Sequence, residues 1–157
     1  MANDCSNTLT IDGLSKEEVQ TFSNLFTSET LLETLLPNAE FSDWGAKRDI
    51  YDCDIDDVQS DHIRCNFNSV WYPVVYGIIN ITKKFPNATF DLSYEEESND
   101  FMGRLKTKNG GSITNECDIT EEVEKLMEAD IDLDEDDAMC TLRNKIEDEI
   151  DKKCGAR

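Results

Sequence analysis

Residues 50–57 alternate strictly between apolar and acidic side chains, and this pattern limits the fold of the chain more than any other stretch. A period of two is typical of a strand with one buried and one open face. Three carboxylates in a row on one face are unfavourable unless that face is in water. The buried face would carry Tyr51, Cys53 and Ile55, and the open face Asp52, Asp54 and Asp56.

A second alternating run follows the turn at residues 58–61. In this run Ile63, Cys65 and Phe67 would point inward, and the polar residues between them outward. Two such runs joined by a short polar turn predict a β-hairpin. Because Cys53 and Cys65 both fall on its inward face, we expect them to be cross-strand neighbours.

The rest of the chain alternates between strand and helix periodicities. Ser15 followed by Glu18 predicts a capping box at the start of the first helix. The Asn109-Gly110 pair is a strong signal for a further hairpin. The expected elements are a strand over 7–11, a helix after Ser15 through Phe26, a short helical run over 28–36, the hairpin strands 50–57 and 63–68, a helix over 73–81, strands over 90–95, 101–107 and 112–119, and two acidic amphipathic helices over 120–127 and 139–150.

A βαββαβ order with right-handed crossovers closes most naturally into a ferredoxin-like sheet, which is antiparallel and carries both helices on one face. We therefore predict an α+β fold of this type with an extra hairpin and a C-terminal acidic helical segment. Residues 1–119 would form the ferredoxin-like domain, and residues 120–157 an acidic helical extension packed on it. The face without helices would be left to solvent or to a partner. We call this face the acidic plate, because it would present Asp52, Asp54, Asp56, Asp91 and Glu95, with Thr8, Thr10, Asn66 and Asn68 between them.

Thirty-five acidic residues against fifteen Lys and Arg give the chain a formal net charge of −20. A field of this size repels nucleic acid and anionic membranes, so the expected partner is basic. The charge is not confined to a tail, since residues 116–157 hold sixteen acids and six bases, and the preceding residues hold nineteen and nine. Six of the eight residues in 130–137 are acidic.

The cysteines have neither the spacing of a metal site nor the context of a disulfide framework. There is no C-x-x-C pair, and one histidine, His62, is available as a further ligand. A disulfide framework is typical of secreted chains too small to build a core. We therefore expect free thiols at Cys5, Cys53, Cys65, Cys117, Cys140 and Cys154.

The acidic segment imitates a calcium loop without completing it. Asp130, Asp132 and Asp134 have the spacing of the first ligands. Glu135 stands where such a loop needs glycine, and Thr141 where it needs a bidentate glutamate. We therefore expect no calcium site.

No pattern indicates an enzyme site or a cofactor. His62 is expected to be a surface residue at a hairpin end, and Gly110-Gly111 belongs to a hairpin rather than to a phosphate-binding loop. The acidic plate lacks the aromatic pair on which ferredoxin-like RNA-binding sheets stack bases. Residues 1–5 lack a signal-peptide pattern, and the longest apolar run, 70–79, is too short to cross a bilayer. We expect a cytosolic protein without catalytic activity, cofactor, direct nucleic-acid binding or membrane binding.

Several stretches, taken in order, carry a family resemblance. They are Asn7 to Gly13, Trp44 to Asp52, Phe67 to Pro73, Phe85-Pro86 with Phe90, Leu92 and Tyr94 to Glu96, and Phe101 to Gly103. Together they resemble the YubB-like ferredoxin-fold family found on plasmids and phages, over about residues 1–115. The resemblance implies a mobile-element origin and a ferredoxin-like fold, and it supplies no catalytic residues. The acidic segment after Cys117 departs from this family's pattern.

Two functions remain open. In the first, the chain mimics nucleic acid and inhibits a basic nucleic-acid-handling host or defence protein, because carboxylates on alternate strand residues lie about 6.6 to 6.8 Å apart, close to the spacing of phosphates on one strand. In the second, it is a protein-interaction module that binds through an apolar patch such as Trp44, Trp71 and Tyr72, and its acidity serves solubility or salt adaptation. The residues expected to contact the partner are Asp52, Asp54, Asp56, Asp91, Glu95, Asp132, Asp134, Glu135, Asp136 and Asp137.

Overall fold

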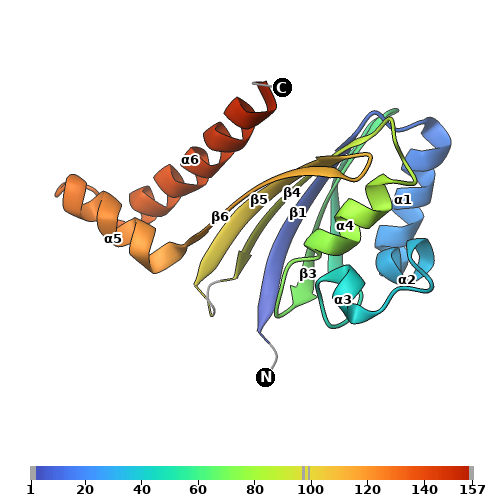
Figure 1. Ribbon diagram of the computed structural model, residues 1–157, viewed down its shortest axis with the longest axis horizontal. Coiled ribbons are helices and arrows are strands. Elements are labelled where there is room, and N and C mark those ends of the chain that lie inside the picture. The colour runs from blue at the N-terminus through green and yellow to red at the C-terminus, as the bar shows by residue number, and fades with distance from the viewer. Residues whose placement is uncertain (1–2, 97, 99, 156–157) are drawn as a thin grey trace.

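Strands and helices follow one another in the order expected for a ferredoxin-like fold (Figure 1). The structure is a computed structural model that describes residues 3–96, 98 and 100–155; Met1 and Ala2, part of the stretch tested for a signal peptide, lie outside them. In chain order the elements are β1 (Asp4–Asp12), α1 (Lys16–Ser28), α2 (Leu31–Leu35), α3 (Phe41–Trp44), β2 (Tyr51–Val58), β3 (His62–Val70), α4 (Val75–Thr82), β4 (Thr89–Glu96), β5 (Phe101–Lys108), β6 (Gly111–Asp118), α5 (Ile119–Ala129) and α6 (Glu135–Gly155).

The strands form one antiparallel sheet in the order β2-β3-β1-β4-β5-β6. β1 lies between β3 and β4, which is the arrangement that two right-handed crossovers produce in a βαββαβ unit. β5 and β6 are the extra hairpin, added beside β4. Its turn residues Asn109 and Gly110 have φ values of 49° and 80°, as a two-residue hairpin turn requires. The predicted ferredoxin-like α+β fold is confirmed.

Helices α1 and α4 cover one face of the sheet, which we call the inner face (Figure 1). The Ser15 hydroxyl accepts from the Glu18 backbone N–H, and the Glu18 carboxylate accepts from the Ser15 N–H, so the predicted capping box is confirmed. α4 begins at Val75, slightly later than the expected start at Pro73. The main core includes Phe22 and Phe26 of α1, Ile78 and Ile81 of α4, and Leu9, Ile11, Ile63, Phe90 and Leu92 of the strands.

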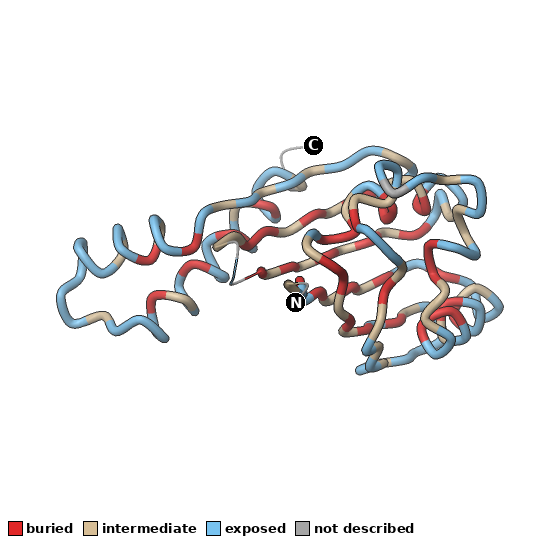
Figure 2. The backbone as a smooth tube through the Cα atoms, turned by 90° about the horizontal axis from the view of Figure 1, so that it is seen from below, coloured by how far each residue is buried: buried red, intermediate tan, exposed pale blue. Residues whose placement is uncertain are grey.

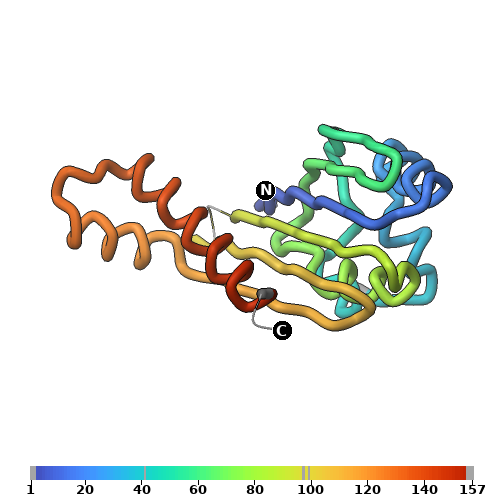
Figure 3. Tube along the Cα trace, turned by 90° about the horizontal axis from the view of Figure 1, so that it is seen from above, coloured from blue at the N-terminus to red at the C-terminus, as the bar shows by residue number. Residues whose placement is uncertain are grey.

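Helices α5 and α6 form a helical hairpin, residues 119–155, which we call the arm. The C-terminal part of α6 lies over β5 and β6 on the outer face of the sheet, opposite α1 and α4, while α5 and the start of α6 project past the end of the sheet (Figures 1 and 3). Most of this projecting part is exposed, with buried residues along the line where the two helices meet (Figure 2). A second apolar cluster joins the arm to the sheet through Met102, Ile119, Val123, Ala138, Leu142 and Ile146.

The prediction that the outer face is left open is therefore wrong for half of that face. Leu142 and Ile146 form the apolar stripe of α6, and burying such a stripe is what stabilises an amphipathic helix on a sheet. Met102 and the half-buried Cys117 provide apolar surface on the outer face of β5 and β6. No helix in the part of the chain that the structure describes is both long and apolar enough to cross a membrane.

Candidate functional site

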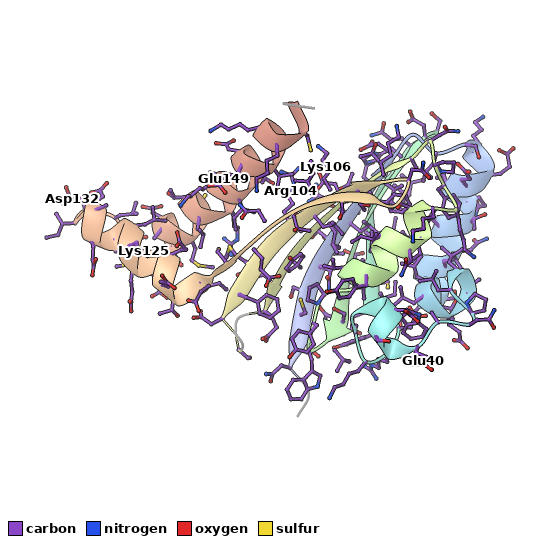
Figure 4. The ribbon with its side chains drawn as sticks, viewed as in Figure 1. Glu40, Arg104, Lys106, Lys125, Asp132 and Glu149 are labelled. Carbon is purple, nitrogen blue, oxygen red and sulfur yellow. The ribbon has the colours of Figure 1, made fainter. Side chains whose placement is uncertain are left out.

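Asp91, one of the residues expected to contact a partner, is bound by Arg104 beneath α6. The Arg104 guanidinium donates from Nε to Asp91 Oδ1 at 2.8 Å and from Nη2 to Oδ2 at 2.6 Å. The side chains of Arg104 and Asp91 are only 12% and 19% exposed. These hydrogen bonds to Asp91 raise the pKa of the Arg104 guanidinium. Arg104 Nη1 also donates to the backbone carbonyl of Glu147 on α6 at 3.4 Å, so one side chain ties the sheet to the arm (Figure 4).

Glu95 is also neutralised by a neighbouring base. Arg143 of α6 donates to both of its carboxylate oxygens, at 3.1 to 3.2 Å. Lys106 of β5 lies 3.5 Å from Asp151 and 4.0 Å from Asp91. The expectation that Asp91 and Glu95 belong to an open acidic face is therefore wrong, because bases from β5 and α6 pair with them and α6 covers this half of the plate.

Asp52, Asp54 and Asp56 are exposed on the edge strand β2, as expected. Asp54 lies opposite Asn66 in the ladder with β3. Asp56 forms an ion pair with Arg64 at 3.2 Å, in which both side chains are about half exposed. These three carboxylates remain accessible to a partner, although one of them already has a basic neighbour.

The spacing of the β2 carboxylates is not the even one that strict alternation predicts. The register between β2 and β3 shifts after Tyr51 and again after Ile55, and such shifts mark β-bulges, in which one strand carries an extra residue. Asp52, at the first shift, has a φ of 51°. Tyr51 lies opposite Asn68 and donates to Asp4, so it does not lie on the inward face as predicted.

The acidic tip of the arm, residues 130–137, is the strongest concentration of exposed carboxylates. Asp134 Oδ1 accepts from the Asp137 N–H at 2.8 Å and so caps α6. The positive end of the helix dipole stabilises the acidic side chains in the first turn of α6. Among the described residues, no ion pair involves a carboxylate of the tip. Asp132 points away at the far end of the molecule (Figure 4), next to Ile131, whose side chain is 94% exposed.

His62 lies at the end of the β2–β3 hairpin. Its Nδ1 is 2.6 Å from Asp12 Oδ1, and its Nε2 is 3.3 Å from Asp57 Oδ2. Both ring nitrogens are therefore engaged by carboxylates on neighbouring strands. This arrangement fixes the hairpin end to β1, and we assign it no catalytic role.

Cys65 lies opposite Ile55 in the ladder between β2 and β3, so the expected direct pairing of Cys53 with Cys65 is wrong, although the two thiols are close enough to interact. The adjacent Cys65 thiol and burial raise the pKa of Cys53. Burial also raises the pKa of Cys5 to about 12 and the pKa of Cys117 to about 11. In the part of the chain that the structure describes, no three His, Cys, Asp or Glu side chains are grouped so as to hold a metal ion.

These environments predict the order in which the thiols react with N-ethylmaleimide at pH 8. The exposed Cys140 should react first, and the fully buried Cys5 and Cys65 at least about ten-fold more slowly, because burial hides both sulfurs from the reagent. In Cys5 burial also disfavours the thiolate, which is the nucleophile. Peptide mapping by mass spectrometry over time would give the order, with protein unfolded in guanidinium as the control. Labelling of Cys5 as fast as that of Cys140 would contradict this picture.

Sequence reasoning missed a groove of about 730 Å³ on the inner face, beyond α4, which we call the aromatic groove. It is lined by Tyr72, Tyr76, Tyr94, Phe101 and Glu116, among others. The side chains of Tyr72 and Tyr76 are 52% and 61% exposed. The rings of Tyr72 and Phe101 stack with centroids 6.5 Å apart. The sequence did contain one indication of the groove. It predicts an extra hairpin but no third helix to cover the inner face of that hairpin.

The apolar patch expected at Trp44, Trp71 and Tyr72 is not a single surface. Trp44 packs against the main core. Lys47 Nζ lies over the ring of Trp71, 4.7 Å from its centroid. Of the three residues, Tyr72 is the one that lines the aromatic groove.

Comparison with known families places part of the chain in a described family. Residues 47–142, more than half of the chain, match the sequence model of a family described as a ferredoxin-like domain in Api92-like protein. The matched region runs from just before β2 into α6 and includes the acidic tip, so much of the segment after Cys117 lies within this family's pattern. No curated protein and no solved structure matches the chain.

Proposed function

This chain belongs to the family of ferredoxin-like domains in Api92-like proteins, and we propose that it is a non-catalytic protein that binds a basic nucleic-acid-handling protein where nucleic acid would bind. The resemblance to YubB-like proteins of plasmids and phages fits this proposal. In that setting the chain would act in the cytosol of a bacterial host and inhibit a host or defence factor.

The acidic tip is the observation that carries the proposal. Its carboxylates are exposed, project past the end of the sheet on a narrow helical hairpin, and have no basic neighbour among the ion pairs of the described residues. Proteins that handle nucleic acid present Lys and Arg to phosphates, and carboxylates can occupy the same places. A concentrated negative field also accelerates encounter with such a surface.

Asp132, Glu135 and Asp136 are the tip residues assigned to partner contact, and Ile131, directly before Asp132, adds an exposed apolar side chain. Asp134 and Asp137 contribute charge, but Asp134 also caps α6. The β2 carboxylates Asp52, Asp54 and Asp56 form a second, smaller acidic surface. Asp91 and Glu95 are left out of the contact surface because Arg104 and Arg143 bind them.

A second candidate function is the interaction module that binds through apolar surface. The observation that favours it is the aromatic groove, in which two tyrosine side chains are more than half exposed. Acidity would then serve solubility. The two candidates differ in which surface a partner covers, so they can be separated by variants of each surface.

Affinity capture from a nuclease-treated bacterial extract tests the proposal. The natural chain is expected to retain a basic protein that binds nucleic acid, and a variant with a neutral tip (Asp132→Asn, Glu135→Gln, Asp136→Asn) is expected to retain much less of it. Nuclease treatment removes proteins bridged by nucleic acid. Recovery of acidic or neutral partners alone, equally by both chains, would favour the interaction module.

A further inference from the structure

β6 is the last strand on its side of the sheet, and its outer edge is regular. All eight of its residues pair with β5 without a shift in register. Among the described residues, no backbone hydrogen bond joins residues 111–118 to an element other than β5. An edge strand of this kind presents a row of N–H and C=O groups that can pair with another chain.

The opposite edge of the sheet is protected. β2 contains two register shifts, and its exposed positions carry three aspartates. The N–H of Cys53 donates to the carboxylate of Glu29, the residue that follows α1, at 3.1 Å. Bulges, charges and covering groups are the means by which proteins prevent pairing at sheet edges. Although α6 packs on the outer face of β6 and Glu149 accepts from Asn115 there, among the described residues β6 has no register shift and no side chain that accepts from its backbone N–H groups, so the two edges are built differently.

The aromatic groove runs beside the free edge of β6. Ser112, Thr114 and Glu116 point to the inner face and line the groove together with Tyr72 and Phe101. Of the groove's described lining residues, Glu116 is the one with a charged side chain. A side chain entering from an added strand would therefore meet tyrosine and phenylalanine rings and one carboxylate.

The Glu116 carboxylate is held in place from across the hairpin. Tyr94 of β4 donates its phenol proton to Glu116 Oε2 at 2.7 Å. Gly103 of β5 lies between these residues in the ladder, and a Cβ at this position would lie 2.5 Å from the Tyr94 oxygen. Burial and the Glu116 carboxylate raise the pKa of Tyr94, so the phenol remains a donor at neutral pH.

We propose that β6 and the aromatic groove bind an extended basic segment of another protein by strand addition, with an arginine or lysine side chain held between Glu116 and Tyr72. Main-chain hydrogen bonds to the edge give affinity in this mode, and pockets for alternate side chains give specificity. A cation on the face of an aromatic ring is attracted by the negative face of the ring. The Glu116 carboxylate makes the site favour a positively charged side chain over a negatively charged one.

A basic segment fits this site better than a second copy of the chain. Two copies with a formal charge of −20 each repel one another, whereas a basic segment is attracted to the chain. The proposal goes beyond the function proposed above, because the site lies on β6 and the inner face, and the acidic tip lies at the end of the arm (Figure 1).

The test uses an eight-residue peptide of alternating threonine and arginine, which matches the length of β6. Titration into the 15N-labelled chain at about 0.15 M salt, where the Debye length is about 8 Å, should shift the β6 amides and the rings of Tyr72 and Phe101 and slow hydrogen exchange along β6. Glu116→Gln should weaken binding about five- to ten-fold and Tyr72→Ala about two- to five-fold. Glu124→Gln, which removes an exposed carboxylate of α5 outside the groove, is the matched control and should leave the affinity within about two-fold.

Two control peptides and one variant make the outcome decisive. A peptide N-methylated on alternate residues cannot complete the ladder and should bind at least about ten-fold more weakly, and alternating threonine and glutamate should not bind. The neutral-tip variant should bind the arginine peptide within about two-fold of the natural chain, so failure of this site and failure of the proposed function are separate results. Equal binding of the N-methylated peptide, shifts confined to residues 130–137, or self-association through β6 in sedimentation would each overturn the proposal.

Discussion

Arg104→Met should lower the free energy of unfolding by about 3 kcal/mol, because it removes both hydrogen bonds from Arg104 to the largely buried Asp91 carboxylate and leaves Lys106, 4.0 Å away, as its basic neighbour. The same change removes the hydrogen bond to the Glu147 carbonyl, so α6 should lose protection before the sheet does. Urea unfolding followed by circular dichroism measures the first effect, and hydrogen exchange of the α6 amides measures the second.

Arg64→Met is the matched control for this prediction. Arg64 also lies on the outer side of a strand and also pairs with an aspartate, but its ion pair with Asp56 is about half exposed. Surface pairs of this kind contribute about 0 to 1 kcal/mol, so this variant should be less than about 1 kcal/mol less stable than the natural chain. Adding Asp91→Asn to Arg104→Met should recover part of the loss. Equal effects of Arg104→Met and Arg64→Met would mean that α6 does not depend on the Arg104 contact.

Neutralising the tip should weaken binding to the basic partner about ten- to one-hundred-fold at low salt, since three contact charges are removed together. The variant is the one carrying Asp132→Asn, Glu135→Gln and Asp136→Asn, which leaves the cap residue Asp134 in place. Helix content is checked by circular dichroism because two of the three acids lie in the first turn of α6. Titration calorimetry or biolayer interferometry with the captured partner gives the affinity.

Asp52→Asn with Asp54→Asn and Asp56→Asn is the control of equal charge. These changes keep the shape of β2, and asparagine accepts the positive φ of residue 52 readily. The β2 variant should weaken binding less than the tip variant, because Asp56 already has a basic neighbour and the even spacing is lost. If the two triple variants weaken binding equally, only total charge matters and the tip is not a specific contact.

Much of the fold could be predicted because its signals are local. The capping box at Ser15, the Asn109-Gly110 turn and the period-two runs each depend on residues close together in the chain. The order of these elements, with right-handed crossovers, leaves few topologies open. The position of β1 between β3 and β4 in the sheet follows from the sequence of elements along the chain.

The candidate surfaces were less predictable because they depend on pairing between distant segments. The alternation of exposed aspartates in β2 survives the two bulges, so the sequence pattern does not reveal the bulges. The apolar stripe of α6 indicates that this helix packs against apolar surface, but it does not indicate which face of the sheet carries that surface. Arg104 and Lys106 on β5, which alternate on the side of Asp91, were the signal that the outer face carries bases as well as acids.

The aromatic groove escaped sequence reasoning for a related reason. Tyr72 and Tyr76 lie before and within α4, whereas Phe101 and Glu116 lie on the extra hairpin. The register of β4, β5 and β6 is what aligns Tyr94, Gly103 and Glu116 across three strands. The alignment of these three residues can be recognised only when the pairing register of the three strands is known.

Displacement of DNA from the captured basic partner tests the central claim most directly. Fluorescence anisotropy of a labelled duplex bound to the partner would be followed as the chain is added, at salt concentrations from about 0.05 to 0.5 M. The chain should displace the duplex at low salt and progressively less as salt rises, and the neutral-tip variant should fail to displace it at a matched concentration. A ternary complex in which partner, duplex and chain remain bound together, or displacement that does not change with salt, would contradict the claim that the acidic tip takes the place of nucleic acid.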